Sequence, residues 1–501
     1  VHNGIIENHH TLKEALNKKM PISWRSETDS EVIAHSIYYY QQYEKTTIEE
    51  AIRRTCETLQ GSYALAIINK KRPNTLFTIC HESPLLLGKA PNGFFIASDP
   101  VALQETTTEM LRLPNNVLLT INLDQVITTP TTQLSWQPTP KSSEQTVQLT
   151  AEHHTFAEIL AQPSTLANLV TNYKEHVFPS INTILLQPPT SLTLLACGSS
   201  HYCAQIAKYW LESTLKLPVF VELASEFRYR NPYIDKTGLL VIISQSGETL
   251  DTLSALRYVK KQHPVPSLAI GNQPLSTIAQ ETDLFWPTYA GVEVGVATTK
   301  VFTAQLFCLQ ILQTMLSSTI PFNTHWEYLP THISQLLTKR EAVAACANTL
   351  LNHEKCIFLG RGPQYAIAQE ACLKVQELSY IPCLAFAAGE LKHGPIALID
   401  KNTILVVLVS DDHYQEKLRA NIAEVHARGG QVLVIGPERL VHAIHAQYQT
   451  IHTFAFTDNT DIYTTAFLHI VCMQLLAYYV AKEKGCAIDK PRNLAKCVSV
   501  E

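Results

Sequence analysis

The sequence lacks the features of several large classes of protein. Its 39 Lys and Arg do not outnumber its 44 Asp and Glu, and no basic stripe stands out, so a nucleic-acid-binding surface is not expected. Its 12 cysteines form no CxxC pair and no zinc-type spacing. The longest near-apolar stretch, 464–481, is interrupted by His469 and Gln474, so we expect a buried helix there and no membrane span.

No secretory leader is present, which predicts reduced thiols and a cytoplasmic protein. The chain starts at Val1 instead of Met, and VHNGIIENH has the pattern of the middle of a domain. We therefore expect that an N-terminal segment is missing from this sequence. The composition is that of a globular protein, with 46% hydrophobic and 17% charged residues, and 501 residues suffice for about three domains.

The first 130 residues predict a strand-rich α/β layer domain. Thr47 and Glu50 form a capping box for a helix over 47–59, and a second helix is expected over 28–41. Short β-prone runs lie at 62–69, 75–80, 93–97 and 117–121. Residues 130–150 are rich in Pro, Ser, Thr and Gln without an apolar period, which is typical of a linker.

The rest of the chain repeats itself. Apolar strands alternate with helices twice, and the paired landmarks are 162 to 166 residues apart: Gly198 with Gly360, Glu226 with Glu390, Ser244 with Ser410, and Gly271 with Gly436. All-apolar strands that alternate with helices predict a parallel sheet covered on both faces. The expected fold class is therefore α/β, with two tandem doubly wound domains after the N-terminal layer domain.

A loop suited to phosphate follows one of these strands. Residues 244–249 (SQSGET) lie between an apolar strand and a helix, and free N–H groups at a helix start attract anions. Helix capping by Ser or Thr explains part of this pattern as well. The matching loop of the second copy carries Asp411 and Asp412, which would repel phosphate. The hydroxyl clusters at 197–200 and 296–300 are expected to face the same crevice.

Acid, base and amine candidates come from the second copy and the tail. Lys374 and Glu377 share one face of a predicted helix, and a surface ion pair would explain them equally well. His393 is suited to moving protons near neutral pH. Lys496 gains a role only if the tail folds over the crevice, where it could form a Schiff base. These residues alone indicate a duplicated phosphosugar-binding protein that transfers protons beside a carbonyl.

At these positions the sequence resembles the family of glutamine–fructose-6-phosphate aminotransferases (isomerizing). The resemblance runs from Val1 to Glu501 and rests on dispersed stretches in one order: VHNGIIENH, TDSEVIAH, ACGSS, ELASEFRYR, SQSGETLDT, GVATTKVFT, FLGRG, GELKHGP and PRNLAKCVSVE. It implies a partial type 2 glutamine amidotransferase domain (1–130), a linker with a connecting helix (131–180), two sugar isomerase (SIS) domains (183–323 and 347–491) and a tail that closes the sugar site (492–501).

The resemblance implies a reaction without metal or organic cofactor. Glutamine is hydrolysed in the N-terminal domain, and the ammonia converts fructose 6-phosphate to glucosamine 6-phosphate, the first step towards UDP-GlcNAc. The implied phosphate residues are Ser244, Gln245, Ser246 and Thr249, and Ser200, Val296 and Thr298 line the sugar; the family usually has Ser at Thr298. The implied catalytic residues are Glu377 as base, His393 for ring opening from the second subunit of a homodimer, Lys496 as imine former, and Lys374.

The resemblance also assigns a glutamine site, with one departure. Asn3 and Gly4 match the oxyanion-hole pair, and Asp29 matches the residue that holds the glutamine α-amino group. The family's nucleophile is an N-terminal cysteine, which would lie upstream of Val1, so we expect the glutaminase half to be inactive as written. The family also tends to have Met and Lys at Thr155 and Ala157, and we expect an altered interdomain contact.

Two alternatives stay open. The chain could act alone as a phosphosugar isomerase or as an aminase supplied with free ammonia. It could also be a non-catalytic SIS sensor of an amino-sugar phosphate. A sensor needs only the phosphate loop, so the presence of Glu377, His393 and Lys496 disfavours it.

Overall fold

The computed structural model describes residues 1–98, 100–123, 125–139, 151–178, 188–317, 325–458 and 460–496. The chain divides into two compact units, Val1–Thr146 (with Val498–Glu501) and Val147–Cys497. Of the segments discussed above, linker residues 140–150 and tail residues 497–501 lie outside the described residues.

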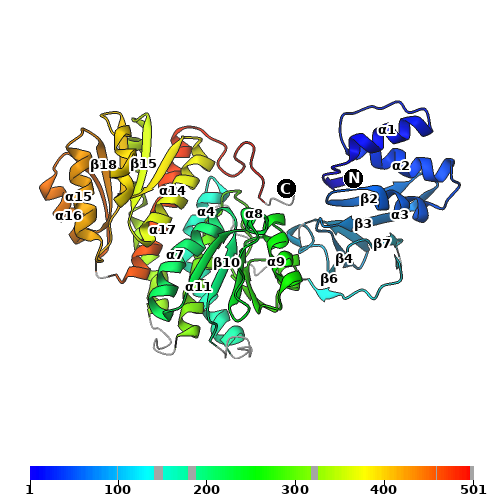
Figure 1. Ribbon diagram of the computed structural model, residues 1–501, viewed down its shortest axis with the longest axis horizontal. Coiled ribbons are helices and arrows are strands. Elements are labelled where there is room, and N and C mark those ends of the chain that lie inside the picture. The colour runs from blue at the N-terminus through cyan, green and yellow to red at the C-terminus, as the bar shows by residue number, and fades with distance from the viewer. Residues whose placement is uncertain are drawn as a thin grey trace. The chain divides into compact units, whose positions relative to one another are not determined.

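The first unit contains two antiparallel sheets and three helices (Figure 1). One sheet has the order β1-β2-β3-β7-β8 and the other β5-β4-β6-β9. Ile33, Ile52 and Phe77 pack between the helices and the first sheet, and Leu87 and Leu119 pack between the sheets. The elements are β1 (His2–Gly4), α1 (His9–Lys19), α2 (Ser30–Gln42), α3 (Ile48–Thr58), β2 (Tyr63–Asn69), β3 (Arg72–His81), β4 (Leu86–Ala90), β5 (Gly93–Ala97), β6 (Glu109–Arg112), β7 (Leu118–Ile121), β8 (Val126–Thr129) and β9 (Gln137–Pro138), with a 3-10 turn at Pro100–Ala102.

Most of the sequence expectations for this unit agree with the structure. Thr47 caps α3 by accepting a hydrogen bond from the backbone N–H of Glu50. Helix α1 was not expected, because it buries only Leu16 and so has little amphipathic pattern. Strand β9 pairs Gln137 with Met110, within the stretch that composition marked as linker.

The second unit contains two parallel five-stranded sheets, as the duplication predicts. Their orders are β11-β10-β12-β13-β14 and β16-β15-β17-β18-β19, so the first strand of each sheet is second in position. The strands of the first sheet are β10 (Leu192–Ala196), β11 (Val219–Leu223), β12 (Leu239–Ser244), β13 (Ser267–Gly271) and β14 (Leu284–Pro287). Those of the second are β15 (Lys355–Gly360), β16 (Cys383–Ala387), β17 (Thr403–Leu408), β18 (Gln431–Pro437) and β19 (His452–Phe456).

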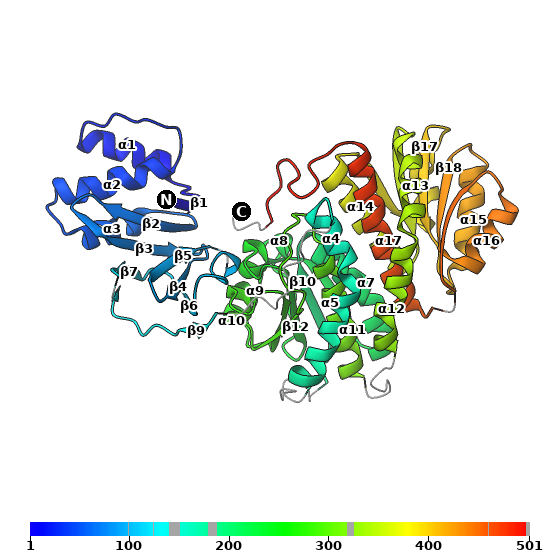
Figure 2. The same cartoon turned by 180° about the vertical axis from the view of Figure 1, so that it is seen from behind.

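Helices cover both faces of each sheet, and Figures 1 and 2 show helices between the two sheets. The inner group shares one large core and consists of α4 (His154–Leu160), α5 (Gln162–Asn172), a π-helical turn (Tyr173–Val177), α7 (Gly198–Leu215), α11 (Lys300–Leu316), α12 (His325–Thr338), α13 (Arg340–Leu351), α14 (Pro363–Ser379) and α17 (Ile462–Glu483). The outer group consists of α8 (Ala224–Phe227), α9 (Leu250–Gln262), α10 (Thr277–Glu281), α15 (Gln415–His426) and α16 (Glu438–Gln447), with 3-10 turns at Arg228–Arg230, Ala388–His393 (η5) and Pro395–Leu398.

One pair of matching residues in the two duplicated domains differs from the pair predicted from the sequence. Gly198, at the start of α7, has φ +54°, and the residue with the matching conformation before α14 is Gly362, with φ +56°. Gly360 is instead the last residue of β15. The landmark was misplaced by two residues because FLGRG offers two glycines and only the backbone conformation distinguishes them.

Helix α17 has the length and composition of a membrane-spanning helix, but its most apolar stretch of 18 residues is entirely buried within the second unit. His469 lies in this helix without solvent exposure, and its Nε2 is 3.1 Å from the carbonyl oxygen of Ile435. Burial lowers the pKa of His469 to about 4, although the hydrogen bond to Ile435 opposes this shift. The histidine is therefore neutral in the folded protein at neutral pH.

We expect His469 to make the second unit sensitive to acid. The folded-state pKa lies below the unfolded value, so the unfolded chain binds a proton first as the pH falls from 6.5 towards 4, and stability is lost in that window. A change from pH 6.5 to 4.5 should cost His469 about 2–3 kcal/mol of unfolding free energy. Urea unfolding at the two pH values should show a smaller loss for His469→Gln, whereas His442→Gln, at an exposed position of α16, should leave the loss unchanged. An equal loss in all three proteins would contradict this account.

Candidate functional site

The candidate site begins where the two halves of the first SIS sheet diverge. Strands β10 and β12 are neighbours, and the chain leaves them towards opposite edges of the sheet. Ligands of doubly wound folds bind at the carboxyl ends of such strands. Residues 197–200 follow β10, and residues 245–249 follow β12, which ends at Ser244. The Thr252 hydroxyl of α9 donates to Cys197 Sγ at 3.7 Å and so joins the two segments. The two hydroxyl clusters therefore lie together at the carboxyl ends of these strands, as expected.

The 244–249 loop is held by its own hydroxyl groups. Ser244 Oγ accepts the N–H of Gly247 at 3.1 Å, and Ser246 Oγ accepts the N–H of Glu248 at 3.1 Å. Gly247 has φ +66°, and a Cβ there would lie 2.0 Å from Ser276 Oγ. Thr249 is the N-cap of α9 but makes no side-chain cap, so the first N–H groups of that helix remain available to an anion.

The start of α7 connects this edge to two other helices. Ser200 Oγ donates to Gln305 Oε1 of α11 at 3.0 Å, and the side chain of Ser199 lies near the carboxyl group of Glu370 on α14. Glu370 is fully buried, and this burial raises its pKa to about 7. The loop after β10 thus contacts the helix that carries Lys374 and Glu377.

On α14, the Lys374 ammonium lies between two carboxylates. It donates to Glu377 Oε2 and lies 3.5 Å from Glu370 Oε1. Burial alone would lower the pKa of Lys374, but Glu370 and Glu377 outweigh it and the pKa is raised. Because Lys374 is buried, this is not the surface ion pair that the sequence also allowed, and Glu377 is the member of the group with partial exposure, at 21% of its side chain.

Lys496 reaches the loop that precedes α11. Its Nζ donates to Glu293 Oε2 at 2.7 Å and to the carbonyl oxygen of Gly295 at 2.6 Å. The Thr298 hydroxyl donates to the same Glu293 oxygen at 2.8 Å. The tail therefore does fold back, and its amine lies beside one of the predicted sugar-binding residues.

One further carboxylate, Glu158, and one lysine, Lys300, lie near this amine and Glu293. Burial raises the pKa of Glu293, but Lys496 and the N–H groups of Thr299 and Val301 outweigh it and the pKa is lowered. Burial and the charge of Glu293 raise the pKa of Glu158 to about 7. Lys300 is also buried, which lowers its pKa.

The matching loop of the second SIS domain is occupied by its own carboxylate. Asp412 accepts hydrogen bonds from the Ser410 hydroxyl and from the N–H of Tyr414, the latter at 2.8 Å. Arg439 Nη2 donates to Asp411 at 2.5 Å. The Ser410 hydroxyl, the Tyr414 N–H and the Arg439 guanidinium are therefore already paired with an aspartate.

His393 is not brought into the group. It lies exposed at the end of η5, and among the residues that the structure describes it makes no hydrogen bond to the other candidates. The family resemblance places it in the site of a neighbouring subunit.

In the first unit, the predicted glutamine residues lie together. Asn3 and Gly4 form β1 and pair with Ala64 and Tyr63. Asp29 Oδ2 accepts the N–H of Ile6 at 2.8 Å, just beyond β1. Gly4 has φ +125°, and a Cβ there would lie 2.1 Å from the Ser62 carbonyl oxygen.

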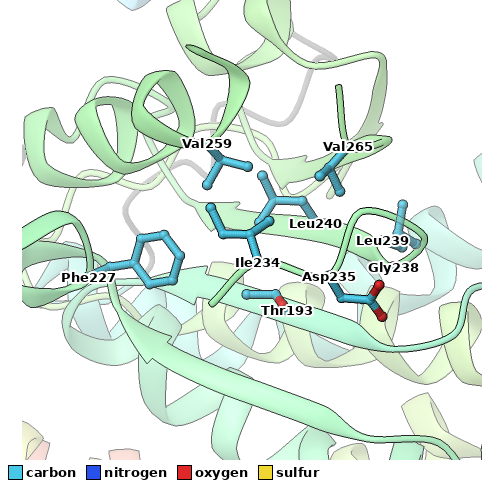
Figure 3. A pocket seen from close by; sticks show the side chains of 9 residues that line it. All are labelled: Thr193, Phe227, Ile234, Asp235, Gly238, Leu239, Leu240, Val259 and Val265. Atoms are coloured by element: carbon cyan, nitrogen blue, oxygen red, sulfur yellow. The ribbon is translucent and has the colours of Figure 1, made fainter. Parts of the chain in front are cut away.

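A small pocket near the start of β12, away from the candidate site, has no comparable group of acidic and basic side chains in its lining (Figure 3). Its lining is apolar except for Thr193 and Asp235. The Asp235 carboxylate already accepts hydrogen bonds from Thr190, Ser191 and Thr237, so it is structural.

Comparison with known proteins decides the family. A SIS domain model matches residues 184–315 and 349–481, and a glutamine amidotransferase domain model matches residues 1–105. The glutamine–fructose-6-phosphate aminotransferase (isomerizing) of Escherichia coli K12 is 38% identical over 521 residues, which cover all of this chain and 84% of that protein. The chain belongs to this aminotransferase family. The Pseudomonas putida relative of the same name is 37% identical with the same coverage.

Solved structures agree with the assignment. The C-terminal domain of glucosamine-fructose-6-phosphate aminotransferase from Francisella tularensis aligns with a TM-score of 0.64 and 33% identity, covering 68% of this chain and 99% of that one. A glucosamine-6-phosphate deaminase from Thermotoga maritima has a TM-score of 0.57 at 24% identity, covering 69% and 99%, and supports the fold.

Sequence reasoning missed the acidic residues that lie beside the candidate lysines. All three are buried: Glu370 lies beside Lys374, and Glu293 and Glu158 lie near Lys496. A carboxylate in an apolar stretch such as GVEVGVA is a usable signal, because a buried charge needs a partner. Thr155 and Ala157, where the family tends to have Met and Lys, are buried within the second unit, and the Thr155 hydroxyl donates to Asp489 at 2.8 Å.

We expect Gly247→Ala to abolish phosphosugar binding. The added Cβ would collide with Ser276, and the positive φ of residue 247 disfavours any side chain. The loop would therefore shift and move the hydroxyls of Ser244 and Ser246. Gly429→Ala is the matched control, because Gly429 has φ +81° with open space around it; both changes should cost about 1–2 kcal/mol of strain. Calorimetric titration with fructose 6-phosphate should show loss of affinity only for Gly247→Ala, and equal affinity in both variants would contradict this role of the loop.

Proposed function

We propose that this chain converts fructose 6-phosphate to glucosamine 6-phosphate, with nitrogen from glutamine or from free ammonia. The observation that carries the proposal is the position of the Lys496 amine, 2.7 Å from Glu293 and beside Thr298, at the end of a tail that composition alone would leave in solvent. A lysine amine held at a fixed position attacks a carbonyl once a neighbouring base has taken its proton.

In this proposal the phosphate group binds at the end of β12. Ser244, Gln245, Ser246 and Thr249 surround the phosphate, and the first N–H groups of α9 add the field of a helix start. Ser200, Val296 and Thr298 contact the sugar. The phosphate then fixes the other end of the open-chain ketose relative to Lys496, and His393 opens the ring.

The lysine must lose a proton before it reacts. Glu293 Oε2 is 2.7 Å from Nζ and takes that proton in our scheme. The neutral amine adds to C2 of the open-chain ketose, and loss of water gives an imine. Ammonia then replaces the lysine on C2, which regenerates Lys496 and leaves the nitrogen on the sugar.

Glu377 completes the isomerisation. A carbon–nitrogen double bond at C2 acidifies the hydrogens on C1, and a carboxylate removes one of them and returns a proton to C2. The Lys374 ammonium donates a hydrogen bond to Glu377 Oε2, so it orients the base. The product is the aldose with an amino group on C2.

We assign glutamine binding to Asn3, Gly4 and Asp29 of the N-terminal domain, where the contact of Asp29 with the N–H of Ile6 supports the assignment. We further propose that the protein works in the cytoplasm as a homodimer, with domain limits at 1–130, 183–323 and 347–491 and a tail from 492 that closes the sugar site. The eleven described cysteines are all free thiols, which is compatible with a reducing compartment.

Lys496→Ala should reduce formation of glucosamine 6-phosphate by at least about 10²-fold, because no imine can form. Binding of fructose 6-phosphate should stay within about twofold of the wild-type value, because the phosphate loop supplies most polar contacts. Product is measured by mass spectrometry with fructose 6-phosphate and ammonium chloride, and separately with glutamine.

Lys490→Ala is the control, since Lys490 is exposed just before the tail. Unchanged turnover in Lys496→Ala would remove this lysine from the mechanism. Glucose 6-phosphate as the sole product with both nitrogen sources would favour a phosphosugar isomerase over the aminotransferase.

A shared site predicts complementation between inactive subunits. If His393 serves the neighbouring subunit, a mixed dimer of His393→Ala and Lys496→Ala subunits contains one intact site. Random mixing of equal amounts should restore about a quarter of the wild-type activity, because half the dimers are mixed and each has one working site. Subunits are exchanged under mild denaturant and assayed for product. No recovery, with exchange verified by mass spectrometry, would place His393 outside a shared site.

A further inference from the structure

Helix α4 lies directly against the loop and the tail that hold Lys496. The Asp489 carboxylate accepts the N–H groups of His154 and Thr155 at 2.9 and 2.8 Å and the Thr155 hydroxyl at 2.8 Å. The backbone carbonyl of Asp489 accepts the N–H of Val296 at 3.1 Å. Asp489, which precedes the tail, therefore connects the start of α4 to the loop 293–296.

The other end of α4 holds the same loop. Glu158 accepts the N–H of Val294, and its two carboxylate oxygens lie 3.3 Å from the N–H nitrogen of Gly295. The approach is close enough that a Cβ on Gly295 would lie 2.6 Å from Thr155 Oγ1 and 2.9 Å from Glu158 Oε2. Residue 295 therefore has to be glycine for this packing.

Gly295 links Glu158 to the reactive amine. Its N–H is held by Glu158, and its carbonyl oxygen accepts a hydrogen bond from Lys496 Nζ at 2.6 Å. The second acceptor of that amine is Glu293, in the same loop. A shift of this loop would move both acceptors of the Lys496 amine at once.

Helix α4 is itself fixed to the core. The ring of Phe156 stacks on Tyr478 of α17 with centroids 4.6 Å apart, and His153 Nδ1 is 3.1 Å from Tyr478 Oη. Just after α4, Gln162 Nε2 donates to Gln474 Oε1 of α17 at 2.8 Å. Because α17 is buried along its length, α4 provides a rigid support for the loop.

We propose that Glu158 and Asp489 are positioning residues of the isomerase centre, which fix loop 293–296 and the C-terminal segment on α4 and so hold the Lys496 amine at the sugar carbonyl. This inference rests on the imine-forming role of Lys496 proposed above. Neither residue touches the phosphate loop, so their removal should change the reactivity of bound sugar and leave its affinity intact.

Trapping of the imine tests this directly. The full chain is mixed with fructose 6-phosphate and borohydride, and the reduced adduct on Lys496 is quantified by peptide mass spectrometry over time. Glu158→Gln and Asp489→Ala should each slow trapping by about tenfold, as loss of a buried charge-assisted hydrogen bond predicts.

Asp461→Ala is the matched control. Asp461 caps α17 by accepting the N–H and hydroxyl of Thr464, as Asp489 does for Thr155, but it does not contact the loop. It should lower the melting temperature as much as Asp489→Ala and leave trapping unchanged. Hydrogen exchange of residues 489–496 should become faster in Glu158→Gln and Asp489→Ala and stay unchanged in Asp461→Ala.

The outcomes separate the two proposals. One outcome would be an adduct on Lys496 in the wild type, with trapping rates and hydrogen-exchange rates in Glu158→Gln and Asp489→Ala equal to those of the wild type. That outcome overturns the positioning role and leaves the proposed function intact. Equal slowing in Asp461→Ala also overturns it, because general destabilisation would then explain the effect. Absence of an adduct on Lys496 in the wild type overturns the proposed function instead, while faster exchange in the two variants would still support the structural tie.

Discussion

The carboxylate of Glu293 is fully buried, and its charge is balanced from three segments of the chain. The N–H groups of Thr299 and Val301 come from the start of α11, the Thr298 hydroxyl from the sugar-site loop, and the ammonium of Lys496 from the tail. A buried charge with one partner removed is costly, so these segments depend on one another. The folded position of the tail, and with it the proposed chemistry, follows from this balance.

The two SIS domains show how one topology supports different roles. Both sheets have the same strand order, and both present a loop at the carboxyl ends of the first and third strands. In the first domain, hydroxyls organise the loop and leave helix N–H groups available. In the second, Asp412 accepts hydrogen bonds that an anion would otherwise receive. In the proposed site, the second domain contributes α14, with Lys374 and Glu377, and the first domain contributes the predicted phosphate loop.

Charge pairing also explains why the candidate acids and bases are buried at all. Glu370 and Glu158 have pKa values raised to about 7 by burial, and each lies near a lysine that limits the cost. Such groups exchange protons near neutral pH with little free-energy change. These titratable carboxylates lie beside Lys374 and Lys496, where we propose that the sugar binds and protons are transferred.

The sequence by itself determined the elements with a clear period. Apolar strands such as LLVIIS and TILVVL are buried, and their alternation with helices predicted the duplicated parallel sheets. The dispersed motifs predicted the family, and the phosphate loop stays a prediction. It did not determine α1, which has little amphipathic pattern, or the short pairing of Gln137 with Met110. Nor did it show that Lys374 is buried or that Lys496 meets Glu293, since these contacts join residues up to about two hundred positions apart. Only tertiary packing decides them, because the pKa and reactivity of a charged group depend on the charges and solvent around it and not on its neighbours in sequence.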